Sequence, residues 1–219
     1  MDPAAIVFDL DGVLVDSEQV WDEVRRAVVT DRGGRWRDEA TRAMQGMSTP
    51  EWSAYLAGPL GAAGTPDELA GIVVAAMAER YRTEMPLLPG AVDAVSTLAA
   101  RWSLAVASSS PPVLIRAVLA AAGMADRFRA VVSSEEVPRG KPAPDVYLAA
   151  ADRLGVEPAG CVAVEDSTNG LRSAAAAGMT VVAVPNPHYP PPAEALALAA
   201  ATVPTPAGLT LELIRDLPG

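Results

Sequence analysis

Short apolar runs separate the chain into segments of two kinds. The first run, residues 6–8, contains only residues that favour β-structure, and it stops abruptly at Asp9. Four similar runs follow in the second half of the chain, at residues 104–107, 130–132, 161–164 and 181–184. A run with no polar member is typical of a strand that is covered on both faces, as the strands of parallel sheets are. The pattern therefore predicts a set of buried parallel strands.

The stretches between the later runs begin and end with helix signals. Ser110-Pro111-Pro112 opens one helix that ends near Gly123, Pro144-Asp145 opens the next, and Ser167 opens a third that ends at Gly178. Serine and proline favour the first turn of a helix, and glycine favours the position after the last turn. Strands that alternate with helices predict an α/β core with a doubly wound parallel sheet.

Residues 16–88 carry successive helix signals, and we expect no strand among them. Ser17, Thr49 and Thr65 are candidate N-caps, and a proline and an acidic residue follow each of the two threonines. We therefore expect two domains, which are a core of residues 1–15 and 89–219 and a helical insert of residues 16–88.

Composition narrows the classes of partner. The chain has 219 residues, half of them hydrophobic, and a formal net charge of −10 at pH 7. An acidic chain without a Lys/Arg-rich run repels nucleic acid, so we expect no nucleic-acid partner. No apolar run approaches the roughly 20 residues needed to cross a bilayer, and the first residues lack the basic start of a signal peptide. We expect a cytoplasmic protein that does not bind membranes and is a monomer or a weak homodimer.

Asp9 and Asp11 follow the first apolar run, two positions apart, and Gly12 then permits a turn. If the extended conformation continues, both carboxylates leave the strand end on the same side. Two carboxylates held that close are tolerated only when one is protonated or a cation lies between them. The pair indicates acid/base chemistry or a divalent metal site, although Asp-Gly is also an ordinary turn signal.

Further polar residues follow other predicted strands, namely Ser108, Lys141 and Glu165-Asp166. Ligands of doubly wound sheets bind beyond the carboxyl ends of the strands, where all these side chains would meet. Taken singly, they could equally be a loop serine, a solvated lysine and the acidic first turn of a helix. Together with the aspartates they supply a nucleophile, a hydroxyl donor, a fixed cation and acidic metal ligands at one edge.

These positions resemble the four motifs of the haloacid dehalogenase superfamily, and the resemblance covers nearly the whole chain. The first motif is matched by Asp9-Leu10-Asp11-Gly12, the second by Ser108, the third by Lys141 and the fourth by Glu165-Asp166. Asp16-Ser17-Glu18 with Trp21-Asp22 is similar to the branch of sugar-phosphate phosphatases and β-phosphoglucomutases. The resemblance implies a Rossmann-like core with a helical cap of the C1 type inserted after the first strand.

The resemblance also implies a role for each motif residue. Asp9 would attack phosphorus and form an aspartyl-phosphate, and Asp11 would act as general acid and base. Mg2+ would be held by the Asp9 side chain, the Asp11 carbonyl oxygen and Asp166, with Glu165 assisting. The transferring phosphoryl oxygens would be bound by Ser108, Lys141 and the main-chain N–H groups of Leu10 and Ser109.

The implied activity is Mg2+-dependent hydrolysis of a small phosphorylated metabolite, a sugar or polyol phosphate. Family members that cleave carbon–halogen bonds lack an acid in the position of Asp11, which favours phosphoryl transfer here. Specificity is expected to reside in the insert, because the core binds only the phosphoryl group that all candidate substrates share. The family's substrate-specificity loop is matched by Gln45, Gly46, Met47, Ser48 and Thr49.

Three alternatives are open at this point. A β-phosphoglucomutase-type mutase would use the same core, but Val20 and Thr49 stand where our alignment places a histidine and an arginine of the mutases. A non-catalytic binding protein would be expected to lack a motif residue, and none is missing. A glycosidase with Asp9 and Asp11 as its carboxylate pair would leave the lysine and the fourth-motif acids without a task.

The other conspicuous residues are predicted to be structural. Tryptophans expected in the core of the insert are Trp21, Trp36 and Trp52. Cys161, the only cysteine, is expected in the core of the sheet, and His188 in an exposed loop. Arginines expected on a solvated face, where one of them could meet a distal anion of the substrate, are Arg25, Arg26, Arg37 and Arg42.

Overall fold

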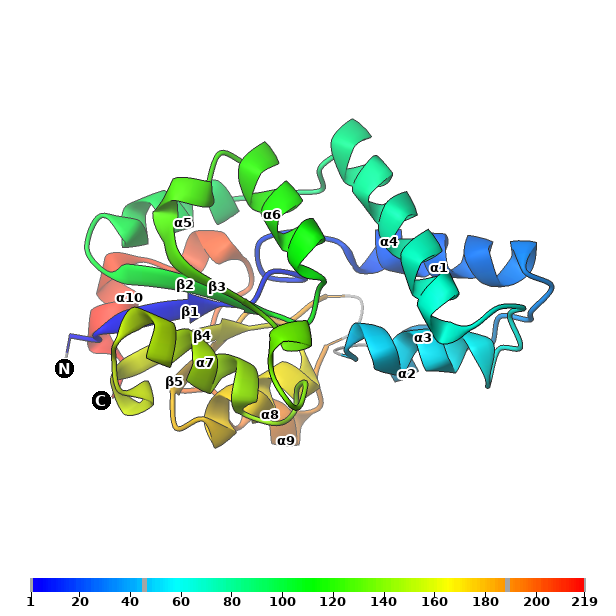
Figure 1. The fold of residues 1–219 in the computed structure, drawn as a ribbon. Coiled ribbons are helices and arrows are strands. Elements are labelled where there is room, and N and C mark those ends of the chain that lie inside the picture. Colours follow the sequence, from blue (N-terminus) through cyan, green and yellow to red (C-terminus); the bar gives the residue numbers. More distant parts are fainter. Residues whose placement is uncertain (1, 45–46, 188–189, 219) are drawn as a thin grey trace.

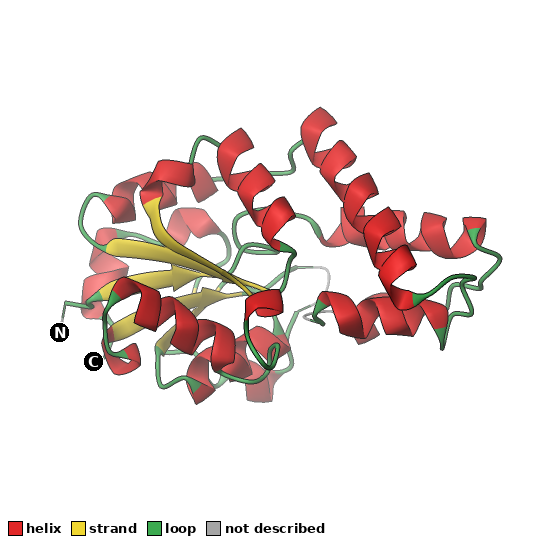
Figure 2. Ribbon diagram, in the orientation of Figure 1, coloured by secondary structure: helices red, strands yellow, loops and turns green. Residues whose placement is uncertain are grey.

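The computed structural model describes residues 2–44, 47–187 and 190–218. Within them, parallel strands form one sheet in the order β3-β2-β1-β4-β5-β6 (Figure 1 and Figure 2). The strands are β1 (Ala5–Phe8), β2 (Ser103–Ser108), β3 (Phe128–Ser133), β4 (Cys161–Glu165), β5 (Thr180–Ala183) and β6 (Ala201–Thr202). The doubly wound sheet predicted from the apolar runs is confirmed. The runs miss β6, because a strand of 2 residues is too short to leave such a run.

Strand β1 lies in the middle of the sheet and pairs with β2 on one side and β4 on the other. All its residues are buried, which explains why the first apolar run has no polar member. Phe8 lies opposite Val106 and Val164, so the carboxyl ends of the three central strands meet at one edge. The chain leaves β1 toward β2 and later returns to its other side with β4, and doubly wound sheets bind ligands at such a reversal.

Helices cover both faces of the sheet (Figure 1). On one face lie α5 (Ala91–Ala99), α6 (Pro112–Ala121) and α10 (Leu211–Asp216), and on the other lie α7 (Asp145–Leu154), α8 (Thr168–Ala176) and α9 (Ala193–Leu196). Short 3-10 helices are η1 (Ala125–Arg127), η2 (Ser134–Glu136), η3 (Pro158–Gly160) and η4 (Pro206–Gly208). Cys161 is buried beneath α7 and α8, as expected of a core residue, and burial raises the pKa of its thiol to about 11.

Four more helices stand beyond the carboxyl edge of the sheet (Figure 1), and they are α1 (Glu18–Asp31), α2 (Ala40–Met44), α3 (Thr49–Ala57) and α4 (Pro66–Thr83). Thr65 caps α4 as predicted, since its hydroxyl accepts the main-chain N–H of Glu68. The predicted cap of α3 is wrong by one residue. Ser48 is the N-cap and forms a capping box with Glu51, whereas Thr49 is already helical.

The two connections between the sheet and these four helices lie side by side. Val15 forms a β-bridge with Leu87, and the N–H of Asp16 donates to the carbonyl of Pro86 at 2.7 Å. We propose that this paired segment marks the boundary between the core of residues 1–15 and 89–219 and the insert of residues 16–88.

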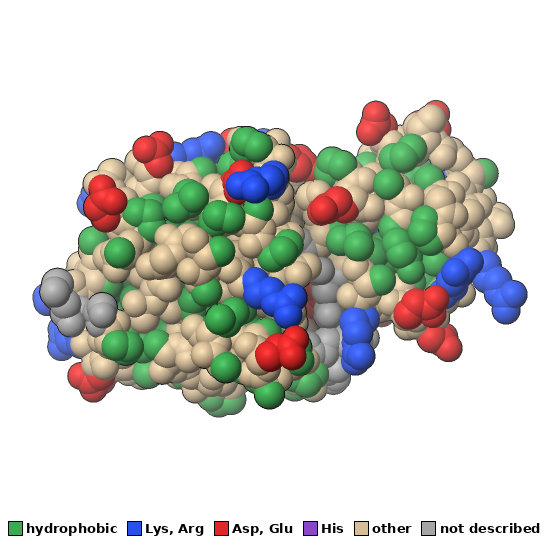
Figure 3. Space-filling model, turned by 90° about the horizontal axis from the view of Figure 1, so that it is seen from below, with side chains coloured by type: hydrophobic (Ala, Val, Ile, Leu, Met, Phe, Trp, Pro, Cys, Tyr) green, Lys and Arg blue, Asp and Glu red, His purple; other side chains and the backbone are tan. Residues whose placement is uncertain are grey.

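The surface carries charges of both signs. On the face drawn in Figure 3, basic side chains are scattered among acidic ones and form no continuous basic patch. In the part of the chain that the structure describes, every helix is too short or too polar to cross a membrane.

Candidate active site

Side chains from the sheet edge and from the insert line a common cleft. Its empty volume, including the part open to solvent, is about 520 Å3. The described lining residues are Asp9, Asp11, Glu18, Trp21, Arg25, Met44, Met47, Trp52, Ser109, Ser110, Pro111, Lys141, Asp166 and Ser167. Motif residues from the ends of separate strands therefore come together as the sequence predicts.

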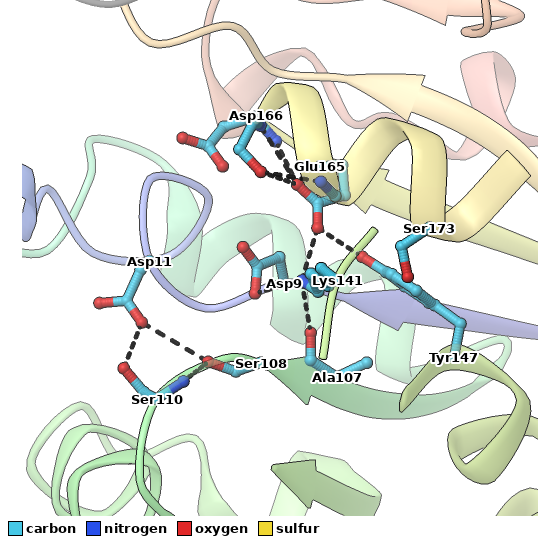
Figure 4. A network of polar contacts seen from close by, with 12 residues as sticks. Asp9, Asp11, Ala107, Ser108, Ser110, Lys141, Tyr147, Glu165, Asp166 and Ser173 are labelled. Atoms are coloured by element: carbon cyan, nitrogen blue, oxygen red, sulfur yellow. Dashed lines mark hydrogen bonds and ion pairs between the residues drawn. The ribbon is translucent and has the colours of Figure 1, made fainter. Parts of the chain in front are cut away.

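Lys141 lies at the centre of the polar network at this edge (Figure 4). Its ammonium nitrogen is 3.0 Å from an Asp9 oxygen and 2.6 Å from a Glu165 oxygen, and it donates to the carbonyl of Ala107 at 3.0 Å. Burial alone would lower the pKa of Lys141, but the two carboxylates outweigh it and raise the pKa above its ordinary value. The site thus holds a permanent buried cation.

Glu165 is the fixed counter-ion of that lysine. One of its oxygens accepts from Lys141 and from the Tyr147 hydroxyl at 2.8 Å. The other accepts from the main-chain N–H groups of the next two residues and from the Ser167 hydroxyl. A Cβ at Gly170 would lie 1.9 Å from this carboxylate, so only glycine leaves room for it at that point of α8. Both oxygens of Glu165 are therefore committed to protein donors.

Three buried carboxylates cluster beside the Lys141 ammonium group, and two of them contact it. Ligand oxygens of Asp9, Glu165 and Asp166 all lie within 4.8 Å of one another. Burial, assisted by Glu165 and Asp11 and opposed by Lys141, raises the pKa of Asp9 to about 8. Burial, followed by Glu165 and Asp9, also raises the pKa of Asp166 well above its ordinary value. The cluster has more negative charge than one lysine can compensate.

A divalent cation fits this excess of charge. Buried carboxylate oxygens without cysteine or histidine are the donor set that Mg2+ prefers. Gly12 has a φ of 78°, and a Cβ there would lie 2.0 Å from an Asp166 oxygen. The turn after the first motif consequently leaves the Asp166 carboxylate unobstructed on the side of Asp9.

Asp11 has its own set of partners, two from the insert and two from the end of β2 and the loop after it. One carboxylate oxygen accepts from the Ser17 hydroxyl and from the Trp21 indole N–H at 3.1 Å. The other accepts from the Ser110 hydroxyl at 2.6 Å and lies 3.5 Å from the Ser108 hydroxyl (Figure 4). Two acids two residues apart thus have different surroundings, because the strand ends at Phe8 and the chain turns after it.

The residues that hold Asp11 were missed by the sequence analysis. Ser17 precedes α1 but makes no side-chain capping bond, because its hydroxyl is bonded to Asp11. Trp21 is buried as expected, yet its indole N–H reaches the site. Val20, which our alignment placed opposite the mutase histidine, is absent from the described lining residues, whereas its neighbour Trp21 is present. The available signal was the position of Ser17 and Trp21 in the first turn after the motif.

Of the predicted phosphate-binding residues, Lys141 and Ser109 line the cleft, whereas Ser108 and Leu10 are buried beside it and are absent from the described lining. Ser108 is fully buried, and its hydroxyl oxygen accepts the N–H of Ser110 at 3.0 Å. Ser109 lines the cleft itself. Leu10 follows β1 directly, and its carbonyl accepts the N–H groups of Leu14 and Val15, which fixes the turn.

The predicted specificity loop is described only in part. Met47 lines the cleft, and Ser48 caps α3. The Thr49 hydroxyl is buried and has no hydrogen-bond partner among the described residues. The predicted residues that lie outside the described ranges are Gln45 and Gly46 of this loop and the loop residue His188.

Arg25 departs from the prediction of a solvated arginine face. Its side chain is buried, and its guanidinium lies over the rings of Trp21 and Trp52. Both tryptophans are buried as expected, and Trp36 is half-buried. The arginines that are exposed as expected are Arg26, Arg37 and Arg42.

Comparison with known proteins agrees with this architecture. A family model described as haloacid dehalogenase-like hydrolase matches residues 3–178. Hexitol phosphatase B of Escherichia coli (strain K12) is 35% identical over 189 residues, which are 84% of each chain. The fructose-1-phosphate phosphatase YqaB of the same strain is 33% identical over 181 residues, 83% of this chain and 96% of that protein. The crystal structure of CbbY from Rhodobacter sphaeroides in complex with phosphate has a TM-score of 0.86 at 26% identity, covering 97% of this chain and 99% of that chain.

The resemblance inferred from the four motifs is thereby confirmed. The family match runs from before β1 to beyond α8, and so includes the helical insert and every motif residue. The chain belongs to the haloacid dehalogenase-like hydrolases.

Proposed function

We propose that the protein is a Mg2+-dependent phosphatase that hydrolyses a sugar or polyol phosphate through an aspartyl-phosphate at Asp9. The observation that carries this proposal is the ion pair of Asp9 with Lys141, while Asp11 has separate donors from the insert and from the loop after β2. One carboxylate is thus available for attack and a second for proton transfer. The two curated relatives described above are named as a hexitol phosphatase and a fructose-1-phosphate phosphatase, which supports the class of substrate.

The reaction has two displacements at phosphorus. In the first, an Asp9 oxygen bonds to phosphorus while the bond to the ester oxygen breaks, and protonated Asp11 gives its proton to that oxygen. In the second, water attacks the phosphorus of the aspartyl-phosphate, and Asp11 takes a proton from the water as Asp9 leaves. The hydroxyls of Ser17 and Ser110 can rotate between donating and accepting, so the contacts of Asp11 suit both of its protonation states.

The remaining motif residues hold charge in place. Asp9, Asp166 and the Asp11 carbonyl would hold Mg2+, which supplies positive charge against the repulsion between a carboxylate and a phosphate dianion. Lys141 presents its ammonium group to Asp9 and to the phosphoryl oxygens, together with Ser108 and the N–H groups of Leu10 and Ser109. We propose that Glu165 acts behind this group by positioning Lys141, because both its oxygens already accept protein donors.

The direct test is phosphate release from a panel of sugar and polyol phosphates, phosphoglycolate and nucleotides, with EDTA or with excess Mg2+. We expect at least one sugar or polyol phosphate to be hydrolysed with Mg2+, and EDTA to lower the rate by about 100-fold or more, reversibly. Activity that persists at the wild-type level in EDTA would contradict the metal-dependent mechanism.

The same assay separates hydrolysis from the mutase alternative, in which a sugar hydroxyl replaces water in the second displacement. Thr49 carries no charge at the position where our alignment places the mutase arginine, which favours water. With β-glucose 1-phosphate and a trace of glucose 1,6-bisphosphate, we expect inorganic phosphate to form faster than glucose 6-phosphate. Isomerisation that outruns phosphate release would overturn the phosphatase assignment.

Asp11→Asn should slow the enzyme according to the leaving group. An alkoxide needs protonation and p-nitrophenolate does not, so the first displacement should lose about 100-fold or more with an alkyl phosphate and far less with p-nitrophenyl phosphate. Single-turnover measurements of ester cleavage isolate this step from hydrolysis of the intermediate. Equal losses for the two esters would remove Asp11 from the role of acid.

We expect the binding partner of this site to be a small phosphorylated metabolite. A cytoplasmic location and a monomeric or weakly dimeric state stay predictions from the sequence.

A further inference from the structure

The cleft contains a buried cation that the mechanism above does not use. Arg25 on α1 is 8% exposed, and its guanidinium carbon lies 4.5 Å from the centre of the Trp21 ring and 5.0 Å from that of Trp52. Within the described ranges, no carboxylate oxygen lies within 4.0 Å of its nitrogens, and its buried Nε has no hydrogen-bond partner. Its positive charge therefore lacks a direct counter-ion.

A buried charge without a counter-ion costs free energy, because it has lost its hydration. Burial lowers the pKa of Arg25 to about 10, although Glu18, Asp11 and Asp22 oppose this through longer-range attraction. The guanidinium consequently remains charged at neutral pH. The two indole rings attract the cation, but its buried Nε has no acceptor and the charge has no anion beside it. An oxyanion bound at the outer guanidinium nitrogens would supply the missing negative charge.

Two other cations of the chain show what a satisfied site looks like. Lys141 is also buried, and it has two carboxylates and a carbonyl as partners. Arg26, the next residue of α1, is exposed and forms an ion pair with Asp22 at 3.1 Å. Arg25 alone of these three lines the cleft without an anionic partner.

The position of Arg25 connects it to the leaving-group side of the site. Trp21 donates its indole N–H to Asp11, the proposed acid, and the same ring underlies the Arg25 guanidinium. Arg25 and Trp52 line the same cleft as Asp9 and Asp11, so the remote end of a substrate whose phosphoryl group lies at Asp9 can reach the guanidinium.

We propose that Arg25 binds a second oxyanion at the end of the substrate remote from the transferred phosphate. The substrate class is then a sugar phosphate that also carries a carboxylate or a second phosphoryl group. This inference rests on the proposed phosphatase function and refines it.

The chemistry of the guanidinium favours an oxyanion over a neutral hydroxyl. A hydroxyl accepts one N–H and leaves the charge uncompensated, whereas a carboxylate or phosphoryl group accepts two N–H donors of the planar fork and supplies the missing negative charge. The competing explanation is that Arg25 only packs the two tryptophans together. In that case substrates with and without a distal anion would respond alike to its replacement.

The test compares kcat/KM within matched pairs of esters, in the presence of Mg2+. The pairs are 6-phosphogluconate with glucitol 6-phosphate, 3-phosphoglycerate with glycerol 3-phosphate, and fructose 1,6-bisphosphate with fructose 1-phosphate. We expect the acidic member of at least one pair to be preferred by about 10-fold or more. A preference in a carboxylate pair identifies a carboxylate ligand, and a preference confined to the last pair identifies a phosphoryl ligand. Preference for the member without a distal anion in all three pairs would overturn the proposal.

Variants then assign that preference to one side chain. Arg25→Gln should lower the ratio within the preferred pair by about 10- to 100-fold, and Arg25→Lys, which keeps the charge without the fork, should lower it less. Arg26→Gln is the matched control, since it removes an exposed arginine from the same helix, and it should leave the ratio unchanged. An unchanged ratio in Arg25→Gln would overturn the assignment, and if that variant does not fold, an unchanged ratio in Arg25→Lys would do the same.

Binding to the Asp9→Asn protein keeps this inference separate from the proposed function. Calorimetric titration of that protein with the two members of a pair needs no turnover. We expect the acidic ester to bind about 10-fold more tightly or better, and Arg25→Gln to remove the difference. Tight acidic binding without turnover by the wild-type protein would contradict the phosphatase function alone, whereas turnover with equal binding of both esters would contradict the role of Arg25 alone.

Discussion

Asp9→Asn is expected to reduce turnover of p-nitrophenyl phosphate by at least about 1,000-fold. The amide has nearly the shape of the carboxylate, but its oxygen is a poor nucleophile and cannot leave readily from a phosphorylated form. Lys141 lies 3.0 Å from the reacting carboxylate and would stay in place. The loss of turnover therefore reflects removal of the nucleophile and not damage to the phosphate-binding residues. Steady-state phosphate release by freshly purified protein is the measurement.

The control for this variant is its stability. Burial raises the pKa of Asp9 from 3.8 to about 8, so ionising this group in the folded protein costs stability progressively as the pH rises through that interval. Asparagine removes the cost, and the midpoint of urea unfolding in EDTA at pH 8 should be equal to or higher than that of the wild type. A stable, folded variant with activity within 10-fold of the wild type would show that Asp9 is not the nucleophile.

Lys141→Met is expected to lower both stability and activity. Methionine is similar in length but leaves the fully buried Glu165 without its cation, and breaking a buried ion pair on one side typically costs about 3–5 kcal/mol. Loss of the ammonium group beside Asp9 should also slow phosphate release by about 100-fold or more. Urea unfolding in EDTA at pH 7.5 measures the first effect, because a bound metal would mask part of it.

Two companion variants distinguish this effect from a general loss of packing. Combining Lys141→Met with Glu165→Gln removes the stranded anion, so part of the stability should return while activity does not. Arg139→Met removes an exposed cation from the same segment, 3.0 Å from Asp145, and should be close to wild type in both measurements. Equal stability of Lys141→Met and the wild type would show that the buried pair has no net role in folding.

The sequence alone determines the arrangement of sheet and helix layers in this protein and the sheet edge at which its candidate catalytic residues lie. Every residue of β1 is buried between two layers of helices, so apolar residues are required throughout and the run has to end where the strand ends. Because parallel strands end at a common edge, the residues after them are predictable neighbours, and Asp9 and Asp166 are found together for this reason. Lys141 is also the only lysine of the chain, a signal that singles it out even without a structure.

The sequence signal for a helix N-cap is reliable only where a single residue at the helix start can act as the cap. Thr65 is followed by proline and is the sole hydroxyl residue at its helix start, so the cap of α4 is predictable. At α3 both Ser48 and Thr49 carry a hydroxyl, and only the extended backbone of Ser48 decides which one caps the helix. The short β6 has no local signal, since its pairing with β5 defines it.

Only the tertiary structure decides which partner each functional side chain has. Asp11 is bonded by Ser17, Trp21 and Ser110, the last of these from a segment 99 positions away in the chain. Arg25 and Arg26 are adjacent arginines of one helix, yet one is buried over Trp52 of α3 and the other is exposed. The physical reason is that burial and charge pairing depend on distances between segments that are remote in sequence, whereas strand and helix formation depends on the order of residues within one segment.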